Sequence, residues 1–351
     1  MLTEKLQKIY RETCADALYT TTDYLRRYLT GFYSTDGFVI SDDKGSTFVA
    51  DLRYAEAAEK ALEGTGIKLE VGAYDRAQEL LEPYMKLGVP FDLISYQEAK
   101  KLTDGGHELF DSLPAFREAM IVKDEKEISL IRKACEIAED AFNALLPEIK
   151  EGMTETEVAA LLEYNMRRLG ASGTSFDTIC AFGENGSVPH HETGTRKLRF
   201  GDIILIDFGC KVDGYCSDIT RTFLFGDDGK HDTFKKAYAE VLKAHNLVKE
   251  KVVSGMTGRE ADAVARDSLK EAGLDKYFTH SLGHGIGLNI HENPYLSPRG
   301  EEVLRDGMVF SDEPGVYFAG EFGIRIEDSV YLENGRVVSF MNRTKKDLII
   351  L

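Results

Sequence analysis

The sequence contains no run of about 18 uncharged apolar residues, the length that an α-helix needs to span a bilayer. Its first residues, MLTEKLQKIYRETCADAL, carry charges every few positions and lack the apolar centre of a secretion signal. Cysteine is also scarce: there are five, an odd number, with no CxxC pair. These absences predict a soluble, cytoplasmic protein with free thiols, because a reducing compartment suits such cysteines best.

Basic side chains are outnumbered, with 43 Lys and Arg against 60 Asp and Glu, and the net charge is −17. Such a charge repels phosphate backbones and anionic lipid. The composition therefore argues against nucleic acid and against a membrane surface as partners.

Several common catalytic motifs are missing as well. There is no P-loop and no GxGxxG. His291 and Glu292 begin like a zincin helix, but position 295 is Tyr instead of the second histidine. Residues 170–174, GASGT, lack the final glycine of a nucleophile elbow. The chemistry must therefore be sought in another arrangement of side chains.

The length of 351 residues favours two domains. Residues 37–43 and 46–52 read as strands and residues 53–66 as a helix, the pattern of a small α/β domain. A long helix is predicted after Asp124, which can form a capping box with Glu127. Its apolar stripe consists of Ile128, Ile131, Cys135, Ala138, Phe142 and Leu145. We place the domain boundary here, giving an N-terminal domain of residues 1–122 and a second domain of residues 123–351.

The second domain contains an internal repeat. The tripeptide Gly-Met-Thr occurs at 152–154 and again at 255–257, each time followed by a glutamate that completes a capping box. Further on, LRFGDIILID at 198–207 parallels LRDGMVFSDE at 304–313. Because the matches keep the same order, they predict a duplicated αβ unit.

Each half of the repeat offers a pair of carboxylates on a predicted hairpin. A turn centred between residues 212 and 213 would place Asp207 directly opposite Asp218, on the same sheet face. A second hairpin around Gly320 would pair Glu313 with Glu327. One such pair could simply face solvent, but Asp207 follows an apolar run and the pattern recurs. Converging carboxylates need neutralisation, which two divalent metal ions would supply.

The histidines gather near the same segments. His280, His284 and His291 lie within twelve residues and beside glycines, which favours a site, and His190 lies in the loop before the first hairpin. The other histidines are predicted to lie at the surface: His107, His191, His231 and His245.

Four segments together resemble one known family: IDFGCKVDGYCSDITRTF, SLGHGIGLNIHE, SDEPGVYFAG and GIRIED. They are similar to the prolidase and Xaa-Pro aminopeptidase (aminopeptidase P) group of M24 metallopeptidases, and the likeness includes the N-terminal domain. The resemblance implies an α+β protein with a pita-bread catalytic domain. That domain would be built of two pseudo-twofold related αβ halves and preceded by a smaller creatinase-like α/β domain. It also implies a homodimer that acts on small proline-containing peptides.

The resemblance further implies a dinuclear site for manganese, or alternatively cobalt or zinc, and a metal-bridged hydroxide that attacks the carbonyl before proline. The implied metal ligands are Asp207, Asp218, His284, Glu313 and Glu327. Glu313 would carry the proton. His280 and His291 would bind substrate and stabilise the intermediate, while His190 and Arg325 would contact substrate.

Two positions depart from the family pattern: residues 192–195, where Pro-Thr-Asp is more usual, and Asp312, where an apolar residue is more usual. Alternatives remain within and outside the enzyme class. A non-proline aminopeptidase or a creatinase-like hydrolase would share the fold. A non-catalytic pita-bread binding module would show degraded ligands, and none of the five is degraded.

Overall fold

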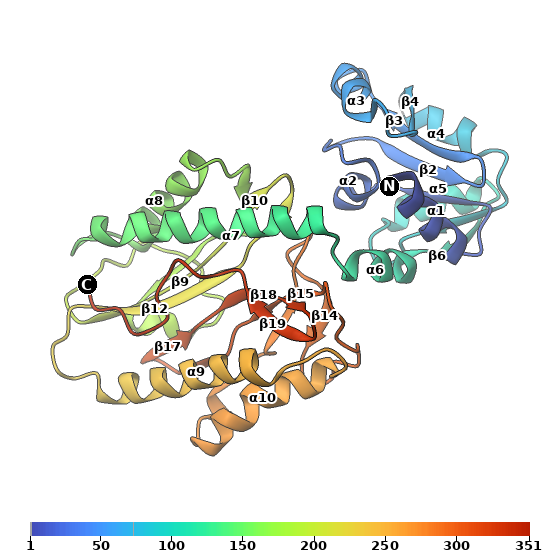
Figure 1. Ribbon diagram of the computed structural model, residues 1–351. Helices are drawn as coiled ribbons and strands as arrows, with labels where there is room; N and C mark the ends of the chain where they lie inside the picture. Colours follow the sequence, from blue (N-terminus) through green and yellow to red (C-terminus); the bar gives the residue numbers. More distant parts are fainter. Residues whose placement is uncertain (1, 73) are drawn as a thin grey trace. The chain divides into compact units, whose positions relative to one another are not determined.

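The chain divides after Met120 into two units, Met1–Met120 and Ile121–Leu351. The computed structural model describes residues 2–72 and 74–351 (Figure 1). Within this described part, none of the helices is both long enough and apolar enough to cross a membrane. All five cysteines are free, four of them buried and Cys14 exposed.

The first unit is built on a six-stranded mixed sheet, in the order β4-β3-β2-β1-β5-β6. The outer pairs β3–β4 and β5–β6 are parallel, whereas β1, β2 and β3 are antiparallel. Its strands are β1 (Ala17–Thr20), β2 (Phe38–Asp42), β3 (Gly45–Ala50), β4 (Lys68–Val71), β5 (Lys86–Val89) and β6 (Glu108–Asp111). Its helices are α1 (Leu2–Glu12), α2 (Asp23–Thr30), α3 (Ala55–Leu62), α4 (Tyr74–Leu81), α5 (Tyr96–Asp104) and α6 (Leu113–Ile121). The two strands and the helix expected over residues 37–66 are confirmed as β2, β3 and α3.

The second unit begins with the predicted long helix and its capping box, α7 (Glu125–Leu145). The apolar stripe is confirmed, since Ile131, Cys135, Ala138 and Phe142 are inaccessible to solvent. The first half continues with α8 (Glu155–Arg168), β7 (Gly173–Thr174), β8 (Ile179–Phe182), β9 (Asp202–Phe208), β10 (Cys210–Val212), β11 (Tyr215–Cys216) and β12 (Ile219–Phe225). Strands β12, β9 and β8 form one sheet and β11, β10 and β7 another.

The second half has α9 (Asp232–Lys251), α10 (Gly258–Glu271), β13 (Gly283–Gly285), β14 (Glu292–Leu296), β15 (Val309–Asp312), β16 (Gly315–Phe318), β17 (Phe322–Arg325), β18 (Asp328–Glu333) and β19 (Arg336–Ser339). Short 3₁₀ turns are η1 (Leu146–Glu148), η2 (Gly183–Ser187) and η3 (Asp275–Tyr277). Strands β9, β12, β17, β18 and β19 lie between α7 and α8 on one side and α9 and α10 on the other (Figure 1). Two large apolar clusters, one for each helix pair, form the core.

The duplication is confirmed at the level of hydrogen bonds. Helices α8 and α10 both begin with the predicted Thr–Glu capping box. The amide of Gly152 donates to Leu198 O at 2.9 Å, and the amide of Gly255 donates to Leu304 O at 2.8 Å. The same chain of contacts therefore joins helix and strand in both halves.

The predicted register of the first hairpin is wrong by two residues along one strand. Asp207 pairs with Thr220, not with Asp218. The turn consists of Asp213 and Gly214, and both have positive φ, 47° and 84°. Two consecutive left-handed residues form the tight turn that matches strand twist, and Asp-Gly suits it. Since a shift of two residues preserves the facing side, Asp218 still points to the same face as Asp207.

The second hairpin has the predicted centre. Gly315 pairs with Arg325 around Gly320, which has a φ of 73°. The same register continues into the neighbouring strands, where Asp312 pairs with Asp328. Glu313 and Glu327 therefore occupy matching positions between the two pairs of strands.

Candidate metal centre

Three carboxylates from both halves of the second unit converge. Asp207 lies near the end of β9, Asp218 directly precedes β12, and Glu327 lies between β17 and β18. Each offers an oxygen within 4.8 Å of the others. Asp218 and Glu327 are buried, at 5% and 2% exposure. Such a buried concentration of negative charge is unfavourable without a counter-charge.

Glu313 and His284 complete the cluster. His284 Nε2 lies 3.4 Å from Glu313 Oε1 and 3.6 Å from Asp218 Oδ2. Ser311 holds both residues, because its hydroxyl accepts from the His284 amide and donates to Glu313 Oε1, each at 3.0 Å. The five side chains singled out from the sequence are therefore brought to one place.

The orientation of His284 suits a metal ligand. Its Nδ1 lies 3.2 Å from Gly285 O, so that nitrogen carries the proton and Nε2 presents a lone pair to the carboxylates. Burial lowers the pKa of His284 to about 4, which keeps the imidazole neutral at physiological pH.

The carboxylates show the reverse effect. Burial and the neighbouring carboxylates raise the pKa of Asp218 and of Glu327 well above their usual values, and burial raises the pKa of Glu313 to about 8. Thr220 stabilises Glu327 through a 2.5 Å hydrogen bond from its hydroxyl. Divalent cations would replace the protons that these groups otherwise retain.

One oxygen of the cluster has free capacity for a ligand. Asp207 Oδ1 is buried and has no hydrogen-bond partner among the residues that the structure describes. Its other oxygen accepts from Arg325 Nη2 at 2.6 Å. A buried, unpaired carboxylate oxygen beside two further carboxylates and a neutral imidazole fits a divalent metal site, whose usual donors are oxygen and nitrogen atoms.

A row of polar groups borders the carboxylates. Arg325 donates from Nη1 to the Tyr317 hydroxyl at 2.6 Å, and that hydroxyl lies 3.0 Å from His280 Nε2. His280 Nδ1 lies 3.9 Å from Glu313 Oε2. Burial lowers the pKa of His280 to about 3 and raises that of Tyr317 to about 12, so both are neutral at pH 7.

The two remaining predicted histidines are more accessible. The ring of His291 lies 4.3 Å from that of His284. Burial and the neighbouring His190 lower the pKa of His291. His190 itself is exposed, and after burial and Arg325 it contributes to the lowered pKa of His280. All four histidines expected from the sequence thus border one site.

Residues 129–334 match metallopeptidase family M24, and residues 3–119 match the creatinase/prolidase N-terminal domain. The chain belongs to metallopeptidase family M24. It is 36% identical to the Xaa-Pro dipeptidase of Pyrococcus furiosus over an alignment of 354 residues. This alignment covers 99% of each of the two chains.

Solved structures share the whole fold. A Xaa-Pro dipeptidase from Bacillus anthracis superposes with a TM-score of 0.94 at 35% identity over 99% of both chains. An X-Pro aminopeptidase from Thermotoga maritima gives a TM-score of 0.90 at 31% identity, over 98% of this chain and 99% of that one. The predicted pita-bread domain with a creatinase-like N-terminal domain is thereby confirmed, as is the assignment to an M24 hydrolase.

The sequence reasoning missed three groups in this M24 centre. Tyr317, Thr220 and Ser311 each contact a predicted site residue through a hydroxyl. Thr220 and Ser311 could have been found from strand alternation, since each lies two residues from Asp218 or Glu313 and shares its face. Tyr317 could not, because it lies on the separate strand pair β16–β17.

Three histidines that were predicted to lie at the surface have mostly or wholly buried side chains: His245, His191 and His231. His245 is inaccessible to solvent and lies between Asp312 and Asp328, which also settles where the unusual Asp312 points. His191 is largely buried, with its Nε2 3.0 Å from Glu155 Oε2. For His245 and His191, a buried carboxylate far away in sequence supplies the partner that makes burial of an imidazole possible.

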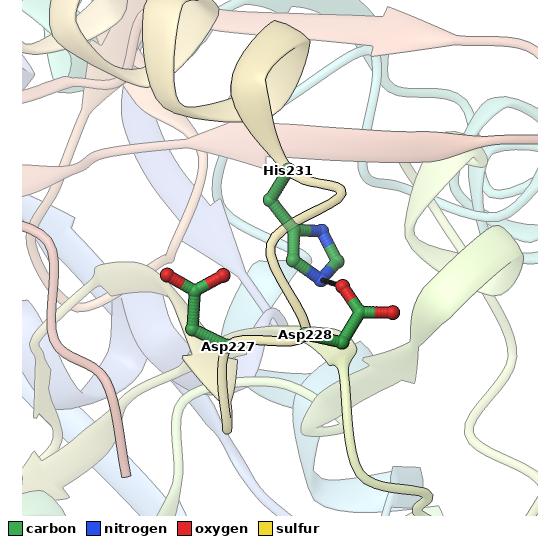
Figure 2. A group of neighbouring side chains, drawn as sticks. All are labelled: Asp227, Asp228 and His231. Atoms are coloured by element: carbon green, nitrogen blue, oxygen red, sulfur yellow. Dashed lines mark ion pairs between the residues drawn. The ribbon is translucent and has the colours of Figure 1, made fainter.

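A second acidic group lies before α9 and comprises Asp227, Asp228 and His231 (Figure 2). The two aspartates are exposed, and each already pairs with a lysine: Asp227 with Lys235 and Asp228 with Lys230. His231 Nε2 lies 3.1 Å from Asp228 Oδ1. These pairs give the group an ordinary surface explanation.

Proposed function

We propose that this protein is a metal-dependent peptidase that hydrolyses the bond between a residue and a following proline, as a Xaa-Pro dipeptidase or a Xaa-Pro aminopeptidase. The observation that supports this most is the convergence of four carboxylates and a neutral imidazole in a chain similar throughout to proline-specific peptidases. In this proposal two divalent ions bind to Asp207, Asp218, His284, Glu313 and Glu327.

When bound, such ions lower the pKa of water toward neutrality and polarise the scissile carbonyl. The side chains have separate tasks. Glu313 takes a proton and returns it to the leaving proline nitrogen, the task of a general acid and base positioned beside the reacting centre. Glu327 and Asp218 hold the reacting centre together, since they come from different halves of the repeat.

The bordering groups bind the substrate and stabilise the negative charge that develops on the carbonyl oxygen. His280 and His291 border that side with neutral rings; the Nδ1 proton of His280 is donated to Ser281 O at 2.7 Å, and its Nε2 accepts from the Tyr317 hydroxyl. Arg325 holds Asp207 and, through Tyr317, His280. A preorganised set of donors of this kind stabilises a transition state more than a ground state. His190, which is exposed at the edge, contacts the substrate.

Further parts of the proposal concern the cell and the assembly. We propose manganese as the metal, with cobalt and zinc as alternatives, since mixed carboxylate and imidazole ligands suit all three. We also propose a cytoplasmic homodimer with a catalytic domain of residues 123–351 and an N-terminal domain of residues 1–122. Free cysteines and acidic composition support the compartment.

The test begins with metal-stripped protein to which manganese, cobalt or zinc is returned. Each form is assayed on Ala-Pro, Ala-Pro-Ala and Ala-Ala, alongside Glu313→Gln. Glu321→Gln is the matched control, because Glu321 is exposed beside the turn of the second hairpin. Cleavage limited to the proline peptides, dependent on metal and lost only in Glu313→Gln, supports the proposal. The ratio of rates on dipeptide and tripeptide then distinguishes dipeptidase from aminopeptidase.

Two results would redirect the proposal. Cleavage of Ala-Ala at a rate comparable to Ala-Pro would favour a non-proline aminopeptidase of the same fold. Binding of two ions without cleavage of any peptide would favour a creatinase-like hydrolase or a binding module.

A further inference from the structure

Glu155 is a fully buried carboxylate that the proposed chemistry does not use. It is the first residue of α8, and its side chain is inaccessible to solvent. Each of its oxygens is near two donors. Oε1 accepts from the Phe182 amide at 2.9 Å and from Asn185 Nδ2 at 2.8 Å. Oε2 accepts from the Gly194 amide at 3.0 Å and lies 3.0 Å from His191 Nε2.

Three of these four donors, Asn185, His191 and Gly194, lie in one loop, and the fourth, Phe182, ends the strand that precedes it. The loop covers residues 183–194 and connects β8 toward β9. It carries His190, and it includes most of the segment that departs from the family pattern. The other side of the loop touches the site, since Arg325 Nη1 donates to Pro189 O at 3.4 Å. Glu155 and Arg325 thus hold the loop on either side of His190.

Residues 193 and 194, which belong to the segment that departs from the family pattern, also attach the loop to its surroundings. Thr193 donates its hydroxyl to Thr178 O at 2.7 Å and accepts from the Cys180 amide at 2.8 Å. Gly194 O accepts from the amide and the hydroxyl of Thr156, at 3.0 and 2.7 Å. The loop end is therefore fixed to the first turn of α8, beside Glu155.

The internal repeat shows that helix formation does not require this carboxylate. In the second half the position equivalent to Glu155 is Gly258, at the same place after the capping threonine. A side chain there would meet Tyr295 O at 2.2 Å. Both helices begin with the same capping box, so the carboxylate at position 155 is an addition specific to the half that carries His190.

We propose that Glu155 is a positioning residue for substrate binding, which fixes the loop of residues 183–194 so that His190 is held at the edge of the metal centre. The inference rests on the proposed peptidase function for its kinetic consequences. The fixing of the loop itself can be measured without any substrate.

The decisive variant is Glu155→Gln, which keeps the size of the side chain but can accept on one oxygen only. We expect KM for Ala-Pro to rise about tenfold while kcat changes less than about threefold, because the loop binds substrate without taking part in proton transfer. The bound metal, measured by elemental analysis, should stay unchanged. Glu157→Gln is the matched control, since Glu157 lies on the same turn and hydrogen-bonds to Thr154 instead of to the loop.

A double-mutant cycle identifies the route of the effect. If Glu155 acts through His190, then His190→Ala should raise KM in the wild type but add less than about twofold in the Glu155→Gln background. Effects that multiply would overturn the proposal, as would a KM of Glu155→Gln equal to that of Glu157→Gln. Should Glu155→Gln fail to fold, His191→Ala removes a single donor and should give a smaller rise in KM.

Hydrogen exchange separates this proposal from the peptidase assignment. In the metal-loaded protein without substrate, amides of residues 183–194 should exchange at least about tenfold faster in Glu155→Gln than in Glu157→Gln. Unchanged exchange in the loop overturns the positioning role whatever the substrate is. Faster exchange in a protein that cleaves no proline peptide supports the positioning role and contradicts only the assigned substrate.

Discussion

His245 Nδ1 lies 3.1 Å from Asp312 Oδ2, and neither side chain is accessible to solvent. On its other side, His245 Nε2 lies 3.5 Å from Asp328 Oδ2. The two aspartates pair directly across β15 and β18, and each is the chain neighbour of a proposed metal ligand. Because adjacent residues on a strand face opposite sides, the imidazole of α9 lies behind the metal centre. It joins strands β15 and β18, which directly adjoin Glu313 and Glu327 in the chain.

Loss of this imidazole should be costly. His245→Leu leaves Asp312 buried without its cation, and removing one partner of a buried ion pair destabilises proteins by about 3–5 kcal/mol. Chemical denaturation should show a loss of this size. In the double variant His245→Leu/Asp312→Ile no unpaired charge remains at position 312, so part of the stability should return. A double variant less stable than His245→Leu alone would contradict the electrostatic explanation.

The same residue should make stability depend on pH. Burial disfavours its charge, but the carboxylates of Asp312 and Asp328 prevail and raise the pKa of His245 to about 9. A raised histidine pKa contributes stability that is complete below the unfolded value of 6.5 and disappears as the pH rises through 9. With metal bound, the free energy of unfolding should fall by roughly 3 kcal/mol across this range. His245→Leu should lack this slope, and an equal slope in the variant would refute the assignment.

The outcome for His245 shows where sequence reasoning stops. The alternation of side chains along a strand is local, and it correctly predicted that Asp207 and Asp218 share a face. The partners of His245 lie more than sixty positions away in sequence, and no local pattern connects α9 to β15. When these carboxylates are not known to be near, the charged sequence of α9 predicts that its histidine lies at the surface.

The pairing register of the two hairpins was harder to predict than the face on which each carboxylate lies. The second hairpin is centred on a lone glycine with a symmetrical sequence around it, and its register was predicted correctly. In the first hairpin, the sequence of residues 212–214 allowed two positions for the turn. The left-handed backbone of Asp213 and Gly214 places the turn at these two residues. A shift by two residues keeps the face but changes the direct neighbour of Asp207 to Thr220. The chemistry was thus predictable from the face, whereas the hydrogen bond from Thr220 to Glu327 was not.

Removal of the metal should produce its own pH dependence. Burial raises the pKa of Glu313 to about 8, above its usual 4.5, so the folded metal-free protein retains a proton that the unfolded chain releases. Stability of the metal-free form should therefore fall as the pH rises from about 5 to 8, with Asp218 and Glu327 acting in the same direction. Thermal unfolding after chelation measures this fall.

Returned metal should largely abolish that dependence. A ligand present at a hundred times its dissociation constant stabilises the folded state by about 2.7 kcal/mol, and more at pH 8 than at pH 5 because fewer protons compete. A melting temperature that is independent of metal at both pH values would show that the carboxylates do not bind ions. Glu313→Gln should weaken the pH dependence of the metal-free form, whereas the exposed Glu321→Gln should not.

The Tyr317 hydroxyl is the only atom that joins Arg325 to His280 in the hydrogen bonds of the described site. Tyr317→Phe keeps the ring and removes that junction, so His280 loses its partner at Nε2. Because a lost preorganised donor typically costs a hundredfold or more, and this hydroxyl acts partly through His280, we expect kcat to fall about 10- to 100-fold. Metal content should not change, since no proposed ligand bonds to the hydroxyl. Tyr277→Phe is the control, as Tyr277 stacks on Phe318 through its ring. A fall in kcat as large in Tyr277→Phe would assign the effect to ring packing and not to the hydroxyl.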